Sequence, residues 1–217
     1  MSTFATRTVV RPALLVLAVA LPLGCANPGP GRIDATTAGM TDTRDMLLKG
    51  DTQVEALVSA ANAIGQNADY KKSFESFSSA FDKVKSTADS VTERWESLKG
   101  KSAAYAKAWQ DETALLSSSE ARDIAESRRR DFNSRFTAVQ SAFGELKSAY
   151  DPFVAQMNDV KVILANDLTA GGISAAAPAI KKAGASAANV RTKAAAAEKL
   201  LAEMISSGAT KGAAQAK

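Results

Sequence analysis

Residues 74–98, "FESFSSAFDKVKSTADSVTERWESL", carry apolar side chains at alternating spacings of three and four residues. This spacing places them on one face of an α-helix, and its regular repetition is typical of a coiled-coil seam. Gly100 falls at the outermost position of the repeat, so we expect one helix over residues 69–116. The seam continues through Ser102, Tyr105, Trp109, Glu112 and Leu116.

A second seam of similar length follows the sequence "SSSE" at residues 117–120. That sequence matches a capping box, which favours the start of a new helix. Pro152 cannot donate a backbone hydrogen bond, so the helix either kinks there or restarts with Asp151 as its cap. Because the seam stays in step across Pro152, we favour one kinked helix. The seam positions are Ala125, Arg129, Phe132, Phe136, Val139, Phe143, Leu146, Tyr150, Phe153, Met157, Val160 and Leu164.

Two shorter helices are expected on either side of this pair, over residues 36–64 and 174–206. Short connections make neighbouring helices antiparallel. The sequence therefore predicts an all-α fold, an elongated antiparallel bundle of four helices with a long central coiled-coil hairpin. The last seam is mostly alanine and buries little apolar area, so we expect that helix to be held least firmly. Residues 207–217 are expected to form a disordered tail, after a bundle domain spanning residues 36–206.

The central helices are longer than the outer pair, so residues 100–131 should protrude as a two-helix arm. The arm leaves the bundle at the end where the chain begins. Phenylalanine and valine fill the predicted core, which leaves no room for a pocket or cleft.

The first 24 residues have the layout of a secretory signal peptide, with Arg7 and Arg11 before an apolar run over residues 13–23. That run is shorter than the roughly 20 residues of a membrane-spanning helix. Cys25, the only cysteine, follows Gly24, and its surroundings resemble the lipobox of bacterial lipoproteins, in which the cysteine is lipidated and becomes the N-terminus. Pro22 departs from the usual leucine of that motif. Residues 25–35 are then expected to form a flexible tether.

Cleavage by ordinary signal peptidase after Ala26 is the alternative. With Cys25 lipidated, we expect a protein of the bacterial cell envelope that faces the periplasm, at the outer membrane. Without lipidation, it would be secreted to the periplasm. Loss of Arg7 and Arg11 leaves 25 basic against 23 acidic residues, so the net charge falls from +4 to +2. The mixed charges do not favour nucleic-acid binding, which needs clustered basic residues.

The chain contains no histidine and one cysteine. Its sequence therefore lacks the most common general base, and lipidation would remove its only thiol nucleophile. It also contains no phosphate-binding loop and no zinc-protease motif. We expect no enzymatic activity, no cofactor and no metal.

The sequence "RRRDF" at residues 128–132, within "ESRRRDF" at 126–132, is the one charge cluster that stands out. It is either a solvated helix face, with Arg129 paired to a carboxylate across the seam, or a patch that binds anionic lipid headgroups. Trp109 lies opposite in the hairpin and is expected to pack in the core, with a cation–π contact to Arg128. The candidate interaction patch consists of Arg128, Arg129, Arg130 and Trp109.

Trp109, "ESRRRDF" and the segment "AYDPFVAQMNDVKVILANDLTA" at residues 149–170 together resemble a family of bacterial envelope proteins known as domain of unknown function 2959. Tyr150, Asp167 and Thr169 depart from its pattern. The resemblance covers residues 36–206 and implies a lipoprotein-type signal followed by a long helical hairpin. It implies no activity and no site. The fitting positions are Asp151, Pro152, Asp159, Val160, Leu164 and Leu168.

We therefore expect a non-catalytic envelope lipoprotein that acts as a structural or partner-binding coiled-coil element. The N-terminal lipid would bind the membrane, and the arm would bind a protein partner. The alternative is an amphipathic helical hairpin that binds or inserts into anionic membrane lipid.

Overall fold

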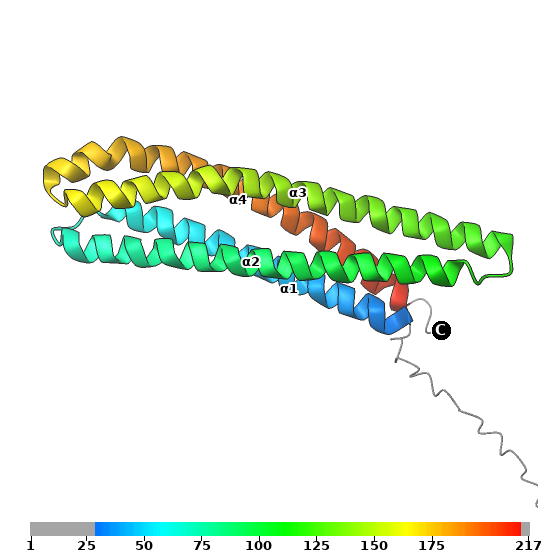
Figure 1. The fold of residues 1–217 in the computed structure, drawn as a ribbon. Coiled ribbons are helices and arrows are strands. Elements are labelled where there is room, and N and C mark those ends of the chain that lie inside the picture. Colours follow the sequence, from blue (N-terminus) through cyan, green and yellow to red (C-terminus); the bar gives the residue numbers. More distant parts are fainter. Residues whose placement is uncertain (1–28, 214–217) are drawn as a thin grey trace, which may run out of the picture.

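The fold was examined in a computed structural model, which describes residues 29–213 of the chain. These residues form four helices and no strand, in the order α1 (Gly29–Ala63), α2 (Tyr70–Thr113), α3 (Ser119–Asn166) and α4 (Ala170–Ala213). The helices run up and down along one long axis (Figure 1). The predicted all-α fold and the antiparallel four-helix bundle are confirmed.

The two long helices begin at capping side chains. The Asp69 carboxylate accepts a hydrogen bond from the Lys72 backbone N–H at 2.9 Å, and the Ser118 hydroxyl accepts one from Ala121 at 3.3 Å. The cap of α3 is therefore Ser118, one residue later than the capping box predicts. Glu120 lies in the first turn, where a carboxylate interacts favourably with the helix dipole.

Helix α3 passes through Pro152 without interruption. The prediction of one helix rather than a restart at Asp151 is therefore confirmed. Pro152 is exposed, so its ring lies away from the core. Gly100 and Gly144 also lie on the outer surface, with no atom within 4 Å of the position that a Cβ would occupy.

The core consists of two clusters separated along the bundle axis. The first lies towards the α1–α2 and α3–α4 turns, and its fully buried side chains include Leu57, Phe77, Phe153, Met157 and Leu164. The second lies towards the α2–α3 turn and contains Met40, Leu47, Trp95, Leu98, Phe136, Val139, Phe143 and Leu201. Alanines of α4 are buried in both clusters, which lets this helix approach closely.

The helices pack mainly as two pairs, α1 with α2 and α3 with α4, and α1 also packs against α4. The direct contact between α2 and α3 is the least extensive of the four. The two long helices are therefore held together mainly through α1 and α4. The seams of α2 and α3 do not pack against each other along their whole length.

The outer helices are longer than the sequence predicts. Helix α1 begins at Gly29, so residues 29–35 are helical rather than tether, and α4 continues to Ala213, so residues 207–213 are helical rather than disordered. Pro30 is accommodated because the first turn of a helix does not need its missing N–H. The expected lipidation site, Cys25, lies outside the described residues.

Longer outer helices leave a shorter arm than the predicted 100–131. Arg32 of α1 forms an ion pair with Glu112, and Gly208 of α4 lines a small cavity together with Arg128. Residues 113–127 lie beyond these two contacts along the hairpin, and we call this segment the arm. At 1.5 Å per residue it projects about 12 Å.

Candidate functional site

The predicted patch lies at the base of the arm. Arg128 stacks over the Trp109 ring at 5.9 Å from the ring centroid, which confirms the predicted cation–π contact. Trp109 is half-buried and packs against Tyr105, with the ring centroids 5.4 Å apart. It therefore contributes to the packing of α2, as expected. These side chains line a cavity of about 80 Å³.

The three arginines of the patch lie in three different environments. Arg130 is exposed and pairs with Glu126 at 3.6 Å. The Nε of Arg129 is buried and has no hydrogen-bond partner among residues 29–213. The predicted pairing of Arg129 with a carboxylate across the seam is therefore wrong. The seam carboxylate of α2, Glu112, binds Arg32 of α1 instead.

The tip of the arm carries an apolar surface that the sequence analysis missed. Leu115 is 82% exposed, Ile124 is 57% exposed and Leu116 is 38% exposed. Leu116 was assigned to the seam, but neither α1 nor α4 extends far enough to cover it. The sequence feature that could have indicated this surface is Ile124, an apolar residue that lies in a polar stretch, one position before the seam.

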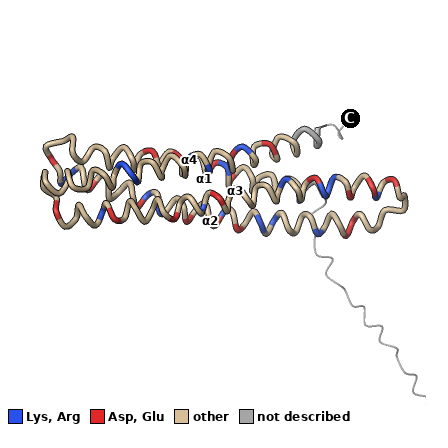
Figure 2. The backbone as a smooth tube through the Cα atoms, turned by 90° about the horizontal axis from the view of Figure 1, so that it is seen from above, with Lys and Arg blue, Asp and Glu red and all other residues tan. Residues whose placement is uncertain are grey.

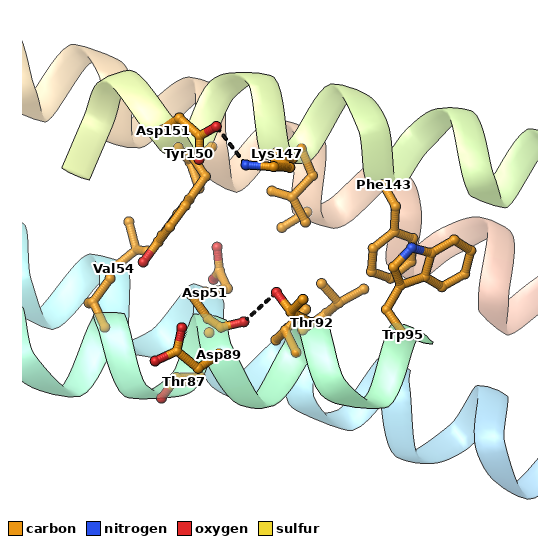
Figure 3. A pocket seen from close by; sticks show the side chains of 18 of the residues that line it. Asp51, Val54, Thr87, Asp89, Thr92, Trp95, Phe143, Lys147, Tyr150 and Asp151 are labelled. Atoms are coloured by element: carbon orange, nitrogen blue, oxygen red, sulfur yellow. Dashed lines mark hydrogen bonds and ion pairs between the residues drawn. The ribbon is translucent and has the colours of Figure 1, made fainter. Parts of the chain in front are cut away.

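A cleft of about 730 Å³ opens between α2 and α3 at mid-length (Figure 3). Its walls are α2 and α3, and α1 and α4 form its floor. It lies where the two core clusters meet. The expectation that the core leaves no room for a pocket is therefore wrong.

Several small side chains line this cleft. Gly50 of α1, Ala88 of α2 and Ala194 of α4 are each too small to fill the space between the helices. One end is closed by Trp95 and Phe143, whose rings stack with centroids 4.1 Å apart and planes within 3°. At the other end the Tyr150 ring extends from α3 across the gap towards Val54 of α1 (Figure 3).

Charged side chains surround the opening, and most of them are paired. Lys147 binds Asp151 at 2.7 Å, and Lys99 binds Glu96 at 2.7 Å. On the floor, Arg191 donates two hydrogen bonds to Asp51, at 2.8 Å and 3.0 Å. The remaining lining carboxylate, Asp89, has no ion pair and no hydrogen bond within the described part of the chain. Acidic side chains in the lining outnumber basic ones by four to three, namely Asp51, Asp89, Glu96 and Asp151 against Lys99, Lys147 and Arg191.

Burial in the cleft, together with the negative charges of Asp89 and Asp151, raises the pKa of Tyr150 to about 12. The phenol is therefore neutral at physiological pH and can donate a hydrogen bond. The cleft combines an apolar floor, two aromatic ends and an acidic side chain at the opening. Small-molecule sites likewise combine apolar and aromatic surface with polar groups that fix the orientation of the ligand.

The effect of Tyr150 on stability has a definite sign. The pKa of tyrosine is about 10 in an unfolded chain, so between pH 10 and 12 the unfolded state loses a proton that the folded state keeps. Stability therefore falls as the pH rises through this range. We expect the free energy of unfolding to fall by about 1 kcal/mol more in the wild type than in Tyr150→Phe, after allowing for solvent screening of a half-buried group. Urea titrations at pH 9.5 and 11.5 measure this difference, and equal losses would contradict it.

Basic and acidic residues alternate along the four helices, with no long run of one sign (Figure 2). Within residues 29–213, no group of three or more acidic, histidine or cysteine side chains is placed to hold a metal ion. None of the described helices has an apolar stretch long enough to cross a membrane.

The fold and its cleft define an elongated all-helical bundle protein. A family model described as protein of unknown function (DUF2959) matches residues 32–204. The chain belongs to this family, as the sequence resemblance predicts. No curated protein and no solved structure matches the chain.

Proposed function

We propose that this protein is a non-catalytic element of the bacterial cell envelope, anchored by a lipid on Cys25, that binds a protein partner along its helical rod. The observation that carries the proposal is the position of the first described residue. Helix α1 starts at the end of the bundle from which the arm projects (Figure 1), and its first residue, Gly29, follows Cys25 by only four residues.

Four residues span at most about 14 Å when fully extended. An acyl chain on Cys25 would therefore hold the arm end of the bundle close to the membrane surface. Helix α2 has 44 residues, which at 1.5 Å per residue makes the rod about 66 Å long. In an upright pose, the far end of the rod would be presented to partners in the periplasm.

The scarcity of side chains suited to general acid–base catalysis supports a binding role. Histidine is missing, and three of the four carboxylates that line the cleft are held in ion pairs, which suits them poorly for acid–base chemistry.

The mass of the mature N-terminus tests the anchor. We expect a peptide that begins with an acylated Cys25, and Cys25→Ser should release the protein from membranes into the periplasmic fraction. A mature protein that begins with an unmodified Asn27 would contradict the anchor. Partner binding is tested by photo-crosslinking in intact cells from exposed positions at the far end, such as Val162, and at the arm tip, Leu115. If neither position crosslinks to a partner, the binding role is contradicted.

Direct binding to lipid is the second candidate, and the apolar arm tip favours it. An anchor at Cys25 would bring Leu115, Leu116 and Ile124 to the depth of the headgroups, because the arm projects about 12 Å beyond the bundle. Apolar side chains inserted there, together with basic residues near the surface, are the two contributions that hold a protein on an anionic membrane.

Vesicle binding distinguishes the two candidates. Lipid binding predicts that the full chain carrying Cys25→Ser binds anionic vesicles in a salt-sensitive manner. The double substitution Leu115→Ser and Ile124→Ser should then abolish binding, and Ala at Arg128, Arg129 and Arg130 should weaken it strongly. The matched control is Val162→Ser, which removes an apolar side chain that is 51% exposed at the opposite end. Partner binding alone predicts that none of these substitutions changes vesicle binding.

A further inference from the structure

The cleft between α2 and α3 is independent of the arm and of the anchor. The geometry points to a binding site there for a small apolar molecule that carries a protonated amine, with the apolar body on the floor of the cleft and the amine at Asp89. This inference goes beyond the proposed function, and it does not depend on lipidation or on a protein partner.

Size is the first argument. The cleft volume of about 730 Å³ lies within the range of about 300–1,000 Å³ that is typical of small-molecule sites. Protein interiors are otherwise packed with few voids larger than a water molecule. A break of this size between two well-packed core clusters therefore provides room for a ligand.

The surface of the cleft is the second argument. Val54 of α1 and Val190 of α4 give the floor an apolar surface beside the Asp51–Arg191 ion pair, and Trp95 stacked on Phe143 forms a flat aromatic wall. This surface loses contact with water when an apolar body covers it, which is favourable in proportion to the area covered. The wall and floor therefore select the apolar part of the ligand.

Charge is the third argument. Asp51, Glu96 and Asp151 are each neutralised by a basic partner, so Asp89 carries the net negative charge of the lining. Asp89 and Tyr150 lie on facing walls at the same end of the cleft (Figure 3). A carboxylate repels an anionic headgroup and attracts an ammonium group, whose hydrogen bond to a carboxylate is charge-assisted. This arrangement selects an amine over a fatty acid.

A series of eight-carbon probes tests the charge selectivity. Octylamine is protonated at pH 7, as a lysine side chain is, octanoate is an anion and octanol is neutral. The protein is the full chain carrying Cys25→Ser and Trp109→Phe, so that Trp95 is the only tryptophan and reports binding by its fluorescence. We expect octylamine to bind at least tenfold more tightly than octanoate, with octanol between them. Equal affinities for the three probes, or no saturable binding of octylamine, would overturn the inference.

Substitutions at the cleft test the location. Asp89→Asn should weaken octylamine binding by about tenfold and leave octanol unchanged, because only the ammonium group interacts with the carboxylate. Ala194→Leu should fill the floor and weaken all probes at least tenfold, as measured by calorimetry and by Trp95 fluorescence. The matched control, Ala195→Leu, adds the same side chain at an exposed neighbouring position and should change nothing.

If Ala194→Leu does not fold, Ala88→Leu fills the same cleft from α2, where Ala88 is half-buried. Unchanged octylamine binding in a folded cleft-filling variant would place the ligand elsewhere and overturn the proposal. Because these measurements use unacylated protein without vesicles, their failure would leave the proposed anchor and partner-binding role unaffected.

Discussion

Replacing Phe153 with alanine is expected to lower the free energy of unfolding by about 4 kcal/mol. Phe153 of α3 is completely buried in the first core cluster, among side chains from all four helices. Its removal leaves a cavity that the surrounding helices can only partly close, so the lost transfer free energy and the cavity both contribute. Urea unfolding followed by circular dichroism measures the change.

Phe143→Ala provides the matched control for this prediction. Phe143 lies on the same helix and is nearly as well buried, but its ring forms a wall of the cleft. Space created there joins a cleft that water can enter, so we expect a loss of about 2 kcal/mol, below the roughly 3–5 kcal/mol typical of a fully buried phenylalanine. A loss at position 143 equal to that at position 153 would contradict an open cleft.

The helical content and the inward faces of the long helices could be predicted because their apolar side chains are large and regularly spaced. Phe77, Phe81 and Val84 of α2 are buried where the seam places them. Gly100 is compatible with one continuous helix because its position in the repeat lies on the outer surface. The structure places Gly100 there. Periodicity reports which face of a helix is buried, and it did so here for helices of more than 40 residues.

The ends of the outer helices could not be predicted because their inward positions include small and polar residues. Thr36 and Thr43 of α1 are buried, and each hydroxyl donates a hydrogen bond to a backbone carbonyl four residues earlier, at 2.9 Å and 2.7 Å. A threonine that satisfies its hydroxyl in this way can face the core. A pattern that counts threonine as polar therefore predicts that α1 begins later than it does. Because the predicted α1 is too short, the predicted arm is too long.

The cleft was missed for a different reason. Periodicity gives the direction of each side chain but not the distance between two helices that face each other. Ala88 and Val91 lie at seam positions of α2, yet both remain half-exposed because they line the cleft. Whether α2 and α3 meet or separate depends on how closely α1 and α4 approach, which is a property of the assembled bundle.

The second large effect is expected from Gly172→Ala, which should lower the free energy of unfolding by about 3 kcal/mol. Gly172 lies in the first turn of α4, just after the three-residue connection from α3. A Cβ added there would lie 2.5 Å from the carboxyl carbon of Asp167 and closer still to its carbonyl oxygen. The backbone of the connection would have to move, because a carbonyl oxygen cannot rotate away as a flexible side chain can.

That movement would also break the cap of α4. The Gly172 backbone N–H donates to the Thr169 hydroxyl at 3.2 Å, and this hydroxyl donates to the Asp167 carboxylate at 2.7 Å. The φ angle of Gly172 is not positive, so the effect is steric and does not depend on the conformational freedom of glycine. Gly171→Ala is the control, because its Cβ would have only an ordinary contact at 3.6 Å, and we expect a change within about 0.5 kcal/mol. Equal stabilities for the two variants in urea titrations would show that the connection does not pack against Gly172.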